Sequence, residues 1–162
     1  MNLETFQMID RVEALDVAAN RIRCLAVVPE RSSILDHHFP GNPILPGVFM
    51  IETMAQCAGY LVLAVNGFSR MPFLARVDGA KLRRFVEPRT SLTVSASLDH
   101  EGSGFVVAEG SIAVDGKEIA STALRFRTIP FPSDEARQML LDAATAVGIA
   151  TDRQNQEAAV DA

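Results

Sequence analysis

Apolar residues follow two patterns along the chain, one typical of strands and one typical of a buried helix. Between residues 91 and 98 every second residue is apolar and its neighbours are serine or threonine, which predicts a strand with one solvated face. Extended runs also cover residues 6–28, with a turn at Asn20, and the segments 73–86, 105–114 and 117–129. The pattern predicts two strands before residue 30 and an antiparallel meander of about four strands after residue 72.

The second pattern is a long apolar run, residues 48–65, which predicts a helix that begins at Pro46-Gly47 and ends near Asn66-Gly67. The run is long enough for a membrane span, but Glu52 and Gln56 lie within it, and a carboxyl group is costly in lipid. A helix that is apolar all round can instead form the core of a soluble domain under a curved antiparallel sheet. We therefore expect an α+β domain with no membrane insertion.

The predicted elements fit one domain, residues 1–132, followed by a C-terminal extension, residues 133–162. Within the domain, residues 30–46 are rich in Ser, Pro, Asp and Gly and predict a loop. Within the extension, residues 133–148 predict a short amphipathic helix, and the polar, alanine-rich residues from 151 onward predict a frayed tail.

Composition and charge narrow the classes of function. The 162 residues carry a net charge of −5, which argues against general affinity for nucleic acid or anionic membranes. The two cysteines, Cys24 and Cys57, cannot build a disulfide framework or a thiolate metal site, which fits a reducing compartment. The N-terminal residues include early acidic side chains and lack the apolar core of a secretory signal. We therefore expect a cytoplasmic protein.

The candidate chemistry lies where the loop rich in proline and glycine meets the apolar helix. His38 in the loop can act as a general base near neutral pH. The first helix amides, at Gly47 and Val48, lack intrahelical partners and can hold an oxygen that becomes negative during a reaction. Glu52 follows in the second turn among apolar residues, which favour the protonated form that a general acid requires. A base, an acid and an oxyanion donor suit removal of a proton next to a thioester carbonyl with loss of a β-hydroxyl.

The segment HFPGNPILPGVFMIETMAQ, residues 38–56, resembles the signature of the FabZ/FabA-type 3-hydroxyacyl-[acyl-carrier-protein] dehydratases. The family pattern is H-F-P-G-x-P, then P-G-V, then a carboxylate fourteen residues after the histidine, which is the separation of His38 and Glu52. Glutamate in place of aspartate resembles the FabZ branch. The similarity continues through FLARVDGAKLRRFVEP and AVDGKEIASTALRF, so it covers roughly residues 6–127.

The resemblance implies a hot-dog fold, in which a curved antiparallel sheet of about six strands wraps one long central helix. It implies reversible dehydration of 3-hydroxyacyl-ACP to trans-2-enoyl-ACP in fatty acid biosynthesis, with His38 and Glu52 as the catalytic pair and with no metal or cofactor. The partners would be acyl carrier protein (ACP) and a second copy of the chain, with His38 of one copy facing Glu52 of the other. Such dimers often assemble further into trimers of dimers. The residues that would bind the substrate and its oxyanion are Gly47, Val48, Phe39 and Pro46.

The chain departs from the family pattern in several places. His37 replaces the glycine that usually precedes the catalytic histidine, the N-terminal L-P-H-R-Y-P-F segment is missing, and Val86-Glu-Pro-Arg89 replaces V-P-G-D. These departures indicate a divergent member that serves long or specialised acyl chains, such as those of lipid A. Acyl length, the choice between ACP and CoA, dimer or hexamer, and isomerase activity stay open at this point.

Several neighbouring residues have plainer explanations than chemistry. Adjacent side chains in an extended loop point apart, so we expect His37 to be exposed or to face the substrate as an accessory. The residues His37, His38, Glu52 and His100 lack the local spacing of metal ligands. Cys57 has no base beside it and is predicted to be a small core residue.

Two further features each allow two interpretations. Gln56, one turn after Glu52, either satisfies backbone groups as a buried amide or supports the carboxylate. Residues 70–89 carry a local charge of +4, which is either an ordinary solvated strand edge or a docking patch for the acidic carrier and its phosphopantetheine. The docking candidates are Lys81, Arg83 and Arg84.

Two other functions fit a domain of this kind. A hot-dog acyl thioesterase would activate water with a carboxylate next to the carbonyl, and it would not need the His–Glu frame. A non-catalytic acyl-ACP binding subunit would bind without turnover. Intact His38 and Glu52 argue against that second alternative.

Overall fold

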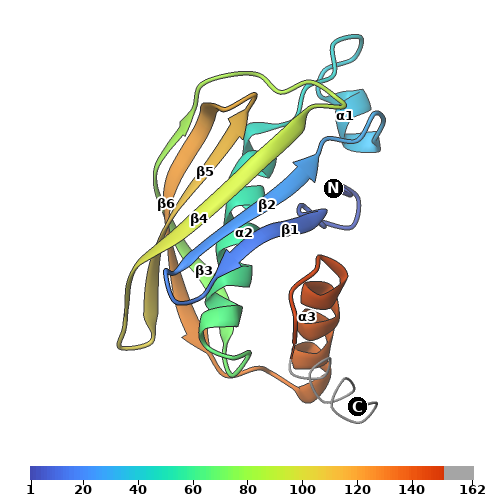
Figure 1. Ribbon diagram of the computed structural model, residues 1–162. Coiled ribbons are helices and arrows are strands. Elements are labelled where there is room, and N and C mark those ends of the chain that lie inside the picture. Colours follow the sequence, from blue (N-terminus) through green and yellow to red (C-terminus); the bar gives the residue numbers. More distant parts are fainter. Residues whose placement is uncertain (152–162) are drawn as a thin grey trace.

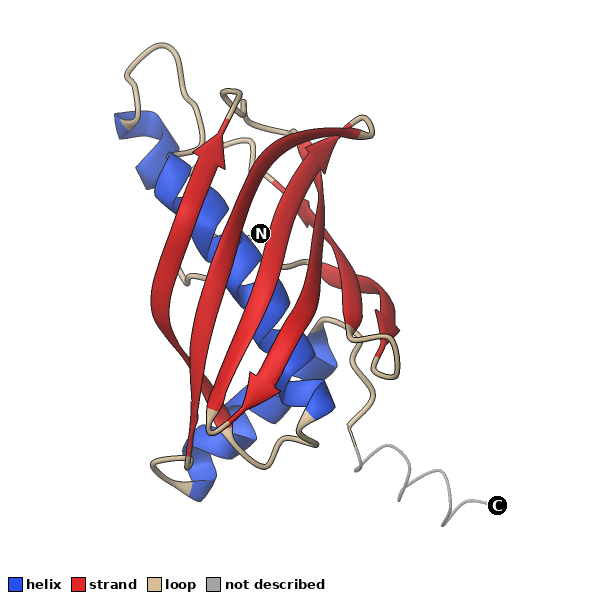
Figure 2. Cartoon of the chain, turned by 90° about the vertical axis from the view of Figure 1, so that its left-hand side faces the viewer, coloured by secondary structure: helices blue, strands red, loops and turns tan. Residues whose placement is uncertain are grey.

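The computed structural model describes residues 1–151, and its centre is an antiparallel sheet of six strands that curves around one helix (Figures 1 and 2). The strands are β1 (Arg11–Asp16), β2 (Arg21–Val27), β3 (Met71–Leu82), β4 (Ser91–Gly102), β5 (Phe105–Val114) and β6 (Lys117–Ile129). The helices are α1 (Ser33–His37), α2 (Gly47–Val65) and α3 (Asp134–Ala146). This arrangement confirms the predicted α+β hot-dog fold.

Helix α2 packs against the inner face of the sheet, which explains its apolar sequence. Met54 and Leu61 on α2 have no exposed surface. On β4, the alternating apolar residues Leu92 and Val94 are buried while the residues between them are exposed or half-buried, as the alternation predicted. The helix packs tightly on the sheet at Gly110 of β5, where an added methyl carbon would lie 3.0 Å from Met54 Cβ. The core therefore lies between α2 and the curved sheet.

Helix α2 is long and apolar enough to cross a membrane by length and composition alone. In this fold, half of its most apolar stretch is buried inside the protein. The buried side chains run along the helix from Met50 to Leu63. Helix α2 is therefore the core helix that the sheet surrounds.

The meander is shorter than the sequence predicted. Strands β4, β5 and β6 are consecutive neighbours, but β3 pairs with β6 at the far edge and β4 pairs with β2, giving the order β1-β2-β4-β5-β6-β3. Helix α2 connects β2 to that far edge, and residues 83–90 lead back to the place beside β2 where β4 begins. Alternation identifies a strand with one buried face but does not identify its neighbour. The predicted four-strand meander is therefore wrong in the placement of β3.

The loop predicted over residues 30–46 contains one short helix, α1, so the prediction is wrong for residues 33–37. Ser32 caps this helix, because its hydroxyl accepts a hydrogen bond from Ile34 N at 3.1 Å. Leu35 then anchors the turn by burying its side chain in the core. The prolines and glycines that exclude a regular helix begin only at Pro40.

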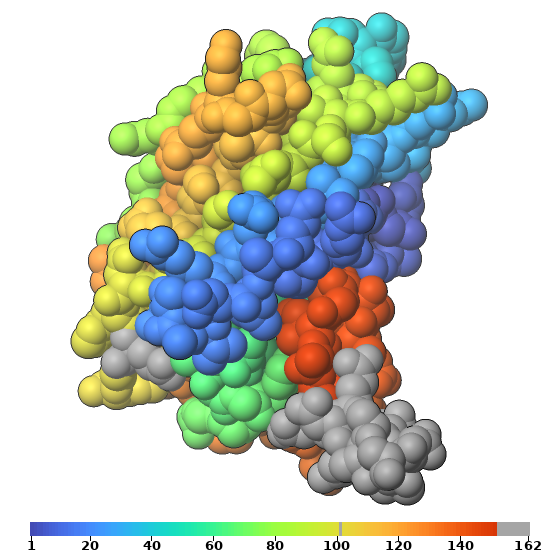
Figure 3. All heavy atoms as spheres, in the orientation of Figure 1, coloured from blue at the N-terminus to red at the C-terminus, as the bar shows by residue number. Residues whose placement is uncertain are grey.

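Helix α3 confirms the predicted amphipathic helix near the C-terminus, and hydrogen bonds attach both of its ends to the rest of the fold. Near its start, Arg137 Nε donates to the carbonyl oxygen of Phe68 at 2.9 Å. Just after its end, Val12 N in β1 donates to the carbonyl oxygen of Val147 at 2.7 Å. Figure 3 shows the red surface of this helix directly against the blue surface of the N-terminal strands. The frayed tail predicted from residue 151 onward lies outside the described residues, except for Thr151 itself.

Candidate active site

His38 follows α1 and begins a tight loop that closes at Ile44. Ile44 N donates to the carbonyl oxygen of His38 at 2.9 Å, and the ring Nδ1 of His38 lies 3.1 Å from the carbonyl oxygen of Ile44. Because a carbonyl oxygen can only accept, Nδ1 carries the proton in this contact, and in the neutral ring Nε2 then has the free lone pair. The ring also stacks on Phe39, with centroids 4.3 Å apart. The loop therefore presents one imidazole nitrogen as a proton acceptor.

His38 and the first residue of α2 line the same cavity, which has a volume of about 450 Å³. Within residues 1–151, no side chain caps α2, since its N-cap residue is Pro46. The first amides, at Gly47 and Val48, therefore keep the donor capacity that the sequence predicted. A methyl group added at Gly47 would collide with the side chain of Leu82, so a larger residue here would require Leu82 to move. The geometry suits an oxyanion donor beside the imidazole.

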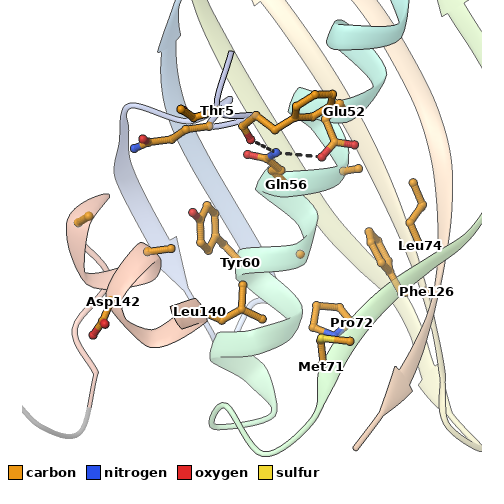
Figure 4. A pocket seen from close by; sticks show the side chains of 16 residues that line it. Thr5, Glu52, Gln56, Tyr60, Met71, Pro72, Leu74, Phe126, Leu140 and Asp142 are labelled. Carbon is orange, nitrogen blue, oxygen red and sulfur yellow. Dashed lines mark hydrogen bonds between the residues drawn. The ribbon is translucent and has the colours of Figure 1, made fainter. Parts of the chain in front are cut away.

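Glu52 lies half-buried on the second turn of α2 and is contacted by Gln56 one turn later (Figure 4). Gln56 Nε2 donates to Glu52 Oε1 at 2.9 Å and to the carbonyl oxygen of Phe6 at 2.7 Å. Gln56 Oε1 accepts from Met8 N at 2.9 Å. Both interpretations that the sequence left open therefore hold. The Gln56 amide satisfies backbone groups of the N-terminal segment, and it also contacts the Glu52 carboxylate.

Glu52 and Gln56 face a second, larger cavity of about 730 Å³. Its lining comes from the N-terminal segment, α2, β3, β6 and α3. His38 does not line this cavity, and Glu52 does not line the 450 Å³ cavity. The two candidate proton-transfer residues therefore face different cavities of one chain.

The three candidate docking residues fall in different places. Arg83 and Arg84 line the cavity of His38, whereas Lys81 lies in β3 outside its lining. Arg83 is paired with Glu118 at 3.1 Å and also donates to Ser121 Oγ at 3.1 Å. Arg84 has an exposed side chain. The structure thus brings two of the three next to the predicted base.

The remaining candidates take structural positions. His37 is exposed, as expected, with its Nδ1 2.7 Å from the carbonyl oxygen of Ser33. Cys57 is buried, and its Sγ lies 3.5 Å from Cys24 Sγ; this hydrogen bond, together with burial, raises the pKa of the Cys57 thiol well above its ordinary value. A raised pKa disfavours the nucleophilic thiolate, so Cys57 is a core residue, as predicted. Among residues 1–151, no group of three or more His, Cys, Asp or Glu side chains could hold a metal ion.

The structure adds contacts that the sequence did not indicate. The backbone groups of Phe6 and Met8 hold Gln56, and the side chain of Leu82 covers Gly47. Helix α3 lines the cavity of Glu52. The first two are contacts between segments far apart in the sequence, for which a single sequence carries no local pattern.

The fold and the two side chains define the class: a hot-dog protein with a candidate base, His38, in the loop before its central helix and a candidate acid, Glu52, on the second turn of that helix. Residues 2–123 match the family model of the FabA-like domain. The chain therefore belongs to the FabA-like family.

Curated relatives place the similarity on the FabZ side of the family. The chain is 34% identical over 121 residues to the 3-hydroxyacyl-[acyl-carrier-protein] dehydratase FabZ of Fusobacterium nucleatum subsp. nucleatum, covering 75% of this chain and 85% of that protein. It is 35% identical over 120 residues to the FabZ of Oenococcus oeni, covering 74% and 86%. It is 36% identical over 125 residues to the FabZ of Thermus thermophilus, covering 75% and 85%.

Solved structures with similar coordinates support the fold alone, because their sequences are distant. A hypothetical thioesterase from Streptococcus pneumoniae, solved with coenzyme A, gives a TM-score of 0.59 at 14% identity and covers 74% of this chain and 85% of that chain. AziG of S. sahachiroi gives a TM-score of 0.63 at 17% identity, covering 79% and 95%.

Proposed function

We propose that this protein catalyses the reversible dehydration of 3-hydroxyacyl-ACP to trans-2-enoyl-ACP in fatty acid biosynthesis, as a hydro-lyase. The observation that carries the proposal is that two groups suited to opposite proton transfers are each oriented by a partner. His38 is oriented by the carbonyl oxygen of Ile44, and Glu52 is contacted by Gln56. Similarity to FabZ dehydratases over three quarters of the chain supports the same reaction.

The arrangement suggests the following step. His38 Nε2 removes the proton from C2 of the 3-hydroxyacyl thioester. As the thioester carbonyl oxygen gains negative charge, the Gly47 amide donates a hydrogen bond to it. The C3–O bond breaks, the electron pair left at C2 forms the double bond to C3, and Glu52 protonates the departing hydroxyl to give water. The reverse sequence adds water across the double bond, so hydratase activity is part of the same proposal. Phe39 follows His38 in the loop, and Pro46 precedes the first residue of the helix. Both would contact the substrate beside His38 and Gly47.

We place the complete site between two copies of the chain. His38 and Glu52 face different cavities within one chain, which supports a site in which His38 of one copy faces Glu52 of the other. Strand β3 forms one end of the described sheet and carries the exposed apolar side chains of Phe73 and Val77. Such an edge suits pairing with a second sheet in a twofold dimer. Assembly of these dimers into a trimer of dimers is part of the same proposal.

The carrier would dock beside the cavity of His38. Arg84 is the stronger candidate contact, because its side chain is exposed at the cavity while Arg83 is already bonded to Glu118 and Ser121. We expect Arg84→Glu to raise KM for an ACP substrate about ten-fold, within the range for one charge contact. KM for the same acyl group on pantetheine should change little. Arg89→Glu is the control, because Arg89 pairs with Glu30 and does not line the cavity. Equal effects of the two variants would exclude Arg84 as the specific contact.

The direct test of function is enoyl formation from 3-hydroxyacyl-ACP of several chain lengths. Wild type should form the enoyl product, and His38→Ala and Glu52→Gln should each lower kcat by at least ~100-fold, the lower range for loss of a general acid or base, while circular dichroism shows an unchanged fold. Release of free thiol without enoyl product would favour the thioesterase alternative. Binding of acyl-ACP without turnover at any length would favour the non-catalytic subunit.

We place this activity in the cytoplasm, where the carrier substrate would be met. The same length series decides whether the protein serves long or specialised chains, such as the hydroxyacyl chains of lipid A, or the shorter chains of general fatty acid synthesis. The preference between ACP and CoA follows from the same assay with the two carriers.

A further inference from the structure

The 730 Å³ cavity extends from the candidate acid toward α3. One end is lined by Glu52 and Gln56 (Figure 4). From there the lining follows α2 to Gly59 and Tyr60, with Pro72 of β3 on the facing side. Burial raises the pKa of Tyr60, in keeping with apolar surroundings for this part of the cavity. The cavity is therefore continuous with the proposed catalytic site and is not a separate hollow.

The wall at the other end belongs to α3. The residues of α3 that line the cavity are Leu140, Asp142, Ala143 and Ala146. Ala143 is half-buried and Ala146 is exposed, and both line the cavity. Larger side chains at these two positions would fill part of the cavity. The only charged member, Asp142, is exposed to solvent. Figure 4 shows Leu140 directed toward α2 and Asp142 lying on the side of α3 away from it.

Helix α3 is fixed firmly enough to act as a wall. Arg137 bonds to the loop after α2, and Val147 bonds to β1, as described above. Ala144, Val147 and Ile149 are buried in the core. Helix α3 follows residue 123, where the match to the FabA-like family model ends. This wall therefore lies outside the region that the family model matches.

We propose that α3 is a specificity element that closes the acyl end of the substrate cavity, so that Leu140, Ala143 and Ala146 set the length of acyl chain that the enzyme accepts. This proposal rests on the proposed function. With C2 and C3 held beside Glu52, the acyl chain extends through the apolar part of the cavity toward α3. Each methylene that stays in apolar contact contributes about four-fold to binding, so loss of space at the far end discriminates against long chains only.

The test fills the far end of the cavity without touching the catalytic residues. In Ala143→Leu, kcat/KM for the longest substrates should fall at least ~16-fold, equivalent to two or more methylenes at about four-fold each. The value for the shortest substrate should stay within about two-fold of wild type, which corresponds to less than one methylene. Ala150→Leu is the matched control, because Ala150 is exposed and does not line the cavity.

Ala146→Leu provides a second variant that keeps the test decisive if Ala143→Leu does not fold, because an exposed position tolerates a larger side chain. Equal loss at all lengths, or no loss at any length, in the folded variants would overturn the role of α3 while leaving the dehydratase proposal intact. Absence of enoyl formation by the wild type at every length would instead overturn the proposed function itself.

Discussion

At the residue scale, Gln56 is the side chain through which the N-terminal segment reaches the candidate acid. Its amide donates to Glu52 and to the Phe6 carbonyl oxygen, and it accepts from the Met8 backbone. An amide held by two backbone groups has a fixed orientation, and it therefore fixes the carboxylate oxygen that it contacts. The N-terminal segment thus contributes to the site through a single side chain on α2.

Gln56→Met tests this positioning role, because methionine has a similar volume and no hydrogen-bonding amide. We expect kcat to fall about ten-fold with little change in KM, since the variant loses an orienting contact and keeps the cavity shape. We also expect stability to fall by about 1–3 kcal/mol, because two backbone groups lose their partner.

The control for Gln56→Met is the double variant with Glu52→Gln. If Gln56 acts through Glu52, then Gln56→Met should lower kcat little further once the carboxylate has been removed, while still lowering stability. Independent, multiplying effects on kcat would show that Gln56 acts only as a structural amide.

The sequence could predict site residues that lie close together in the chain, but it could not predict contacts between distant segments. One stretch of fifteen residues contains His38, Gly47 and Glu52. The chemistry of this loop and helix follows from the residue types alone. The partners of Gln56 are backbone groups 48 and 50 residues away, which only the folded chain brings together. Even so, the two interpretations predicted for Gln56 are the two contacts that the structure shows.

At the scale of elements, the spacing between α2 and the sheet depends on glycine at Gly110. A methyl group there would lie 3.0 Å from Met54 Cβ and 3.4 Å from Leu124 Cδ1, and Met54 Cβ belongs to a helix that cannot shift alone. Gly59, inside α2, offers the opposite case, because an added methyl would lie 3.9 Å from Pro72 Cγ, which is an ordinary contact.

These two glycines form a matched pair of substitutions. Gly110→Ala should lower the free energy of unfolding by about 1–3 kcal/mol through overpacking. Gly59→Ala should leave it unchanged or raise it by up to about 1 kcal/mol, because alanine favours the helix interior. Urea denaturation of the two purified variants measures both values. A Gly110→Ala variant as stable as wild type would show that α2 is free to move away from β5.

Element types were largely predictable, and the errors have specific causes. The sequence correctly predicted the hairpin at Asp115-Gly116, the turn at Asn20 and the ends of α2. Each of these is specified by residues that are close together in the sequence, either turn-forming residues or the limits of the apolar run. Helix α1 was not predicted, because a helix of five residues with one buried leucine is too short to show a helical repeat of apolar residues. The position of β3 was wrong because strand pairing at opposite edges depends on the path of α2.

At the scale of the whole molecule, the two residues proposed to transfer protons, His38 and Glu52, line different cavities of one chain. Phe39 and Phe85 line the 450 Å³ cavity and have exposed side chains, and Val48 at the start of α2 is also exposed. Together with the end strand β3 they leave apolar surface that a second copy would cover. In a twofold dimer, each of the two sites would then take its base from one copy and its acid from the other. Neither residue would act alone, and a single substitution at His38 or Glu52 in one copy would disable one of the two sites only.

Mixing His38→Ala with Glu52→Gln tests this central claim most directly. Each variant is inactive by itself, but a mixed dimer holds one site with both native residues, from the His38 of one copy and the Glu52 of the other. After the subunits are exchanged at equal concentrations, the account predicts recovery of about a quarter of wild-type enoyl formation, because half of the dimers are mixed and each has one of two sites intact. Mass spectrometry confirms that mixed dimers have formed. If they form and activity stays at the level of the single variants, the two residues do not meet across a dimer, and the account of the site is contradicted.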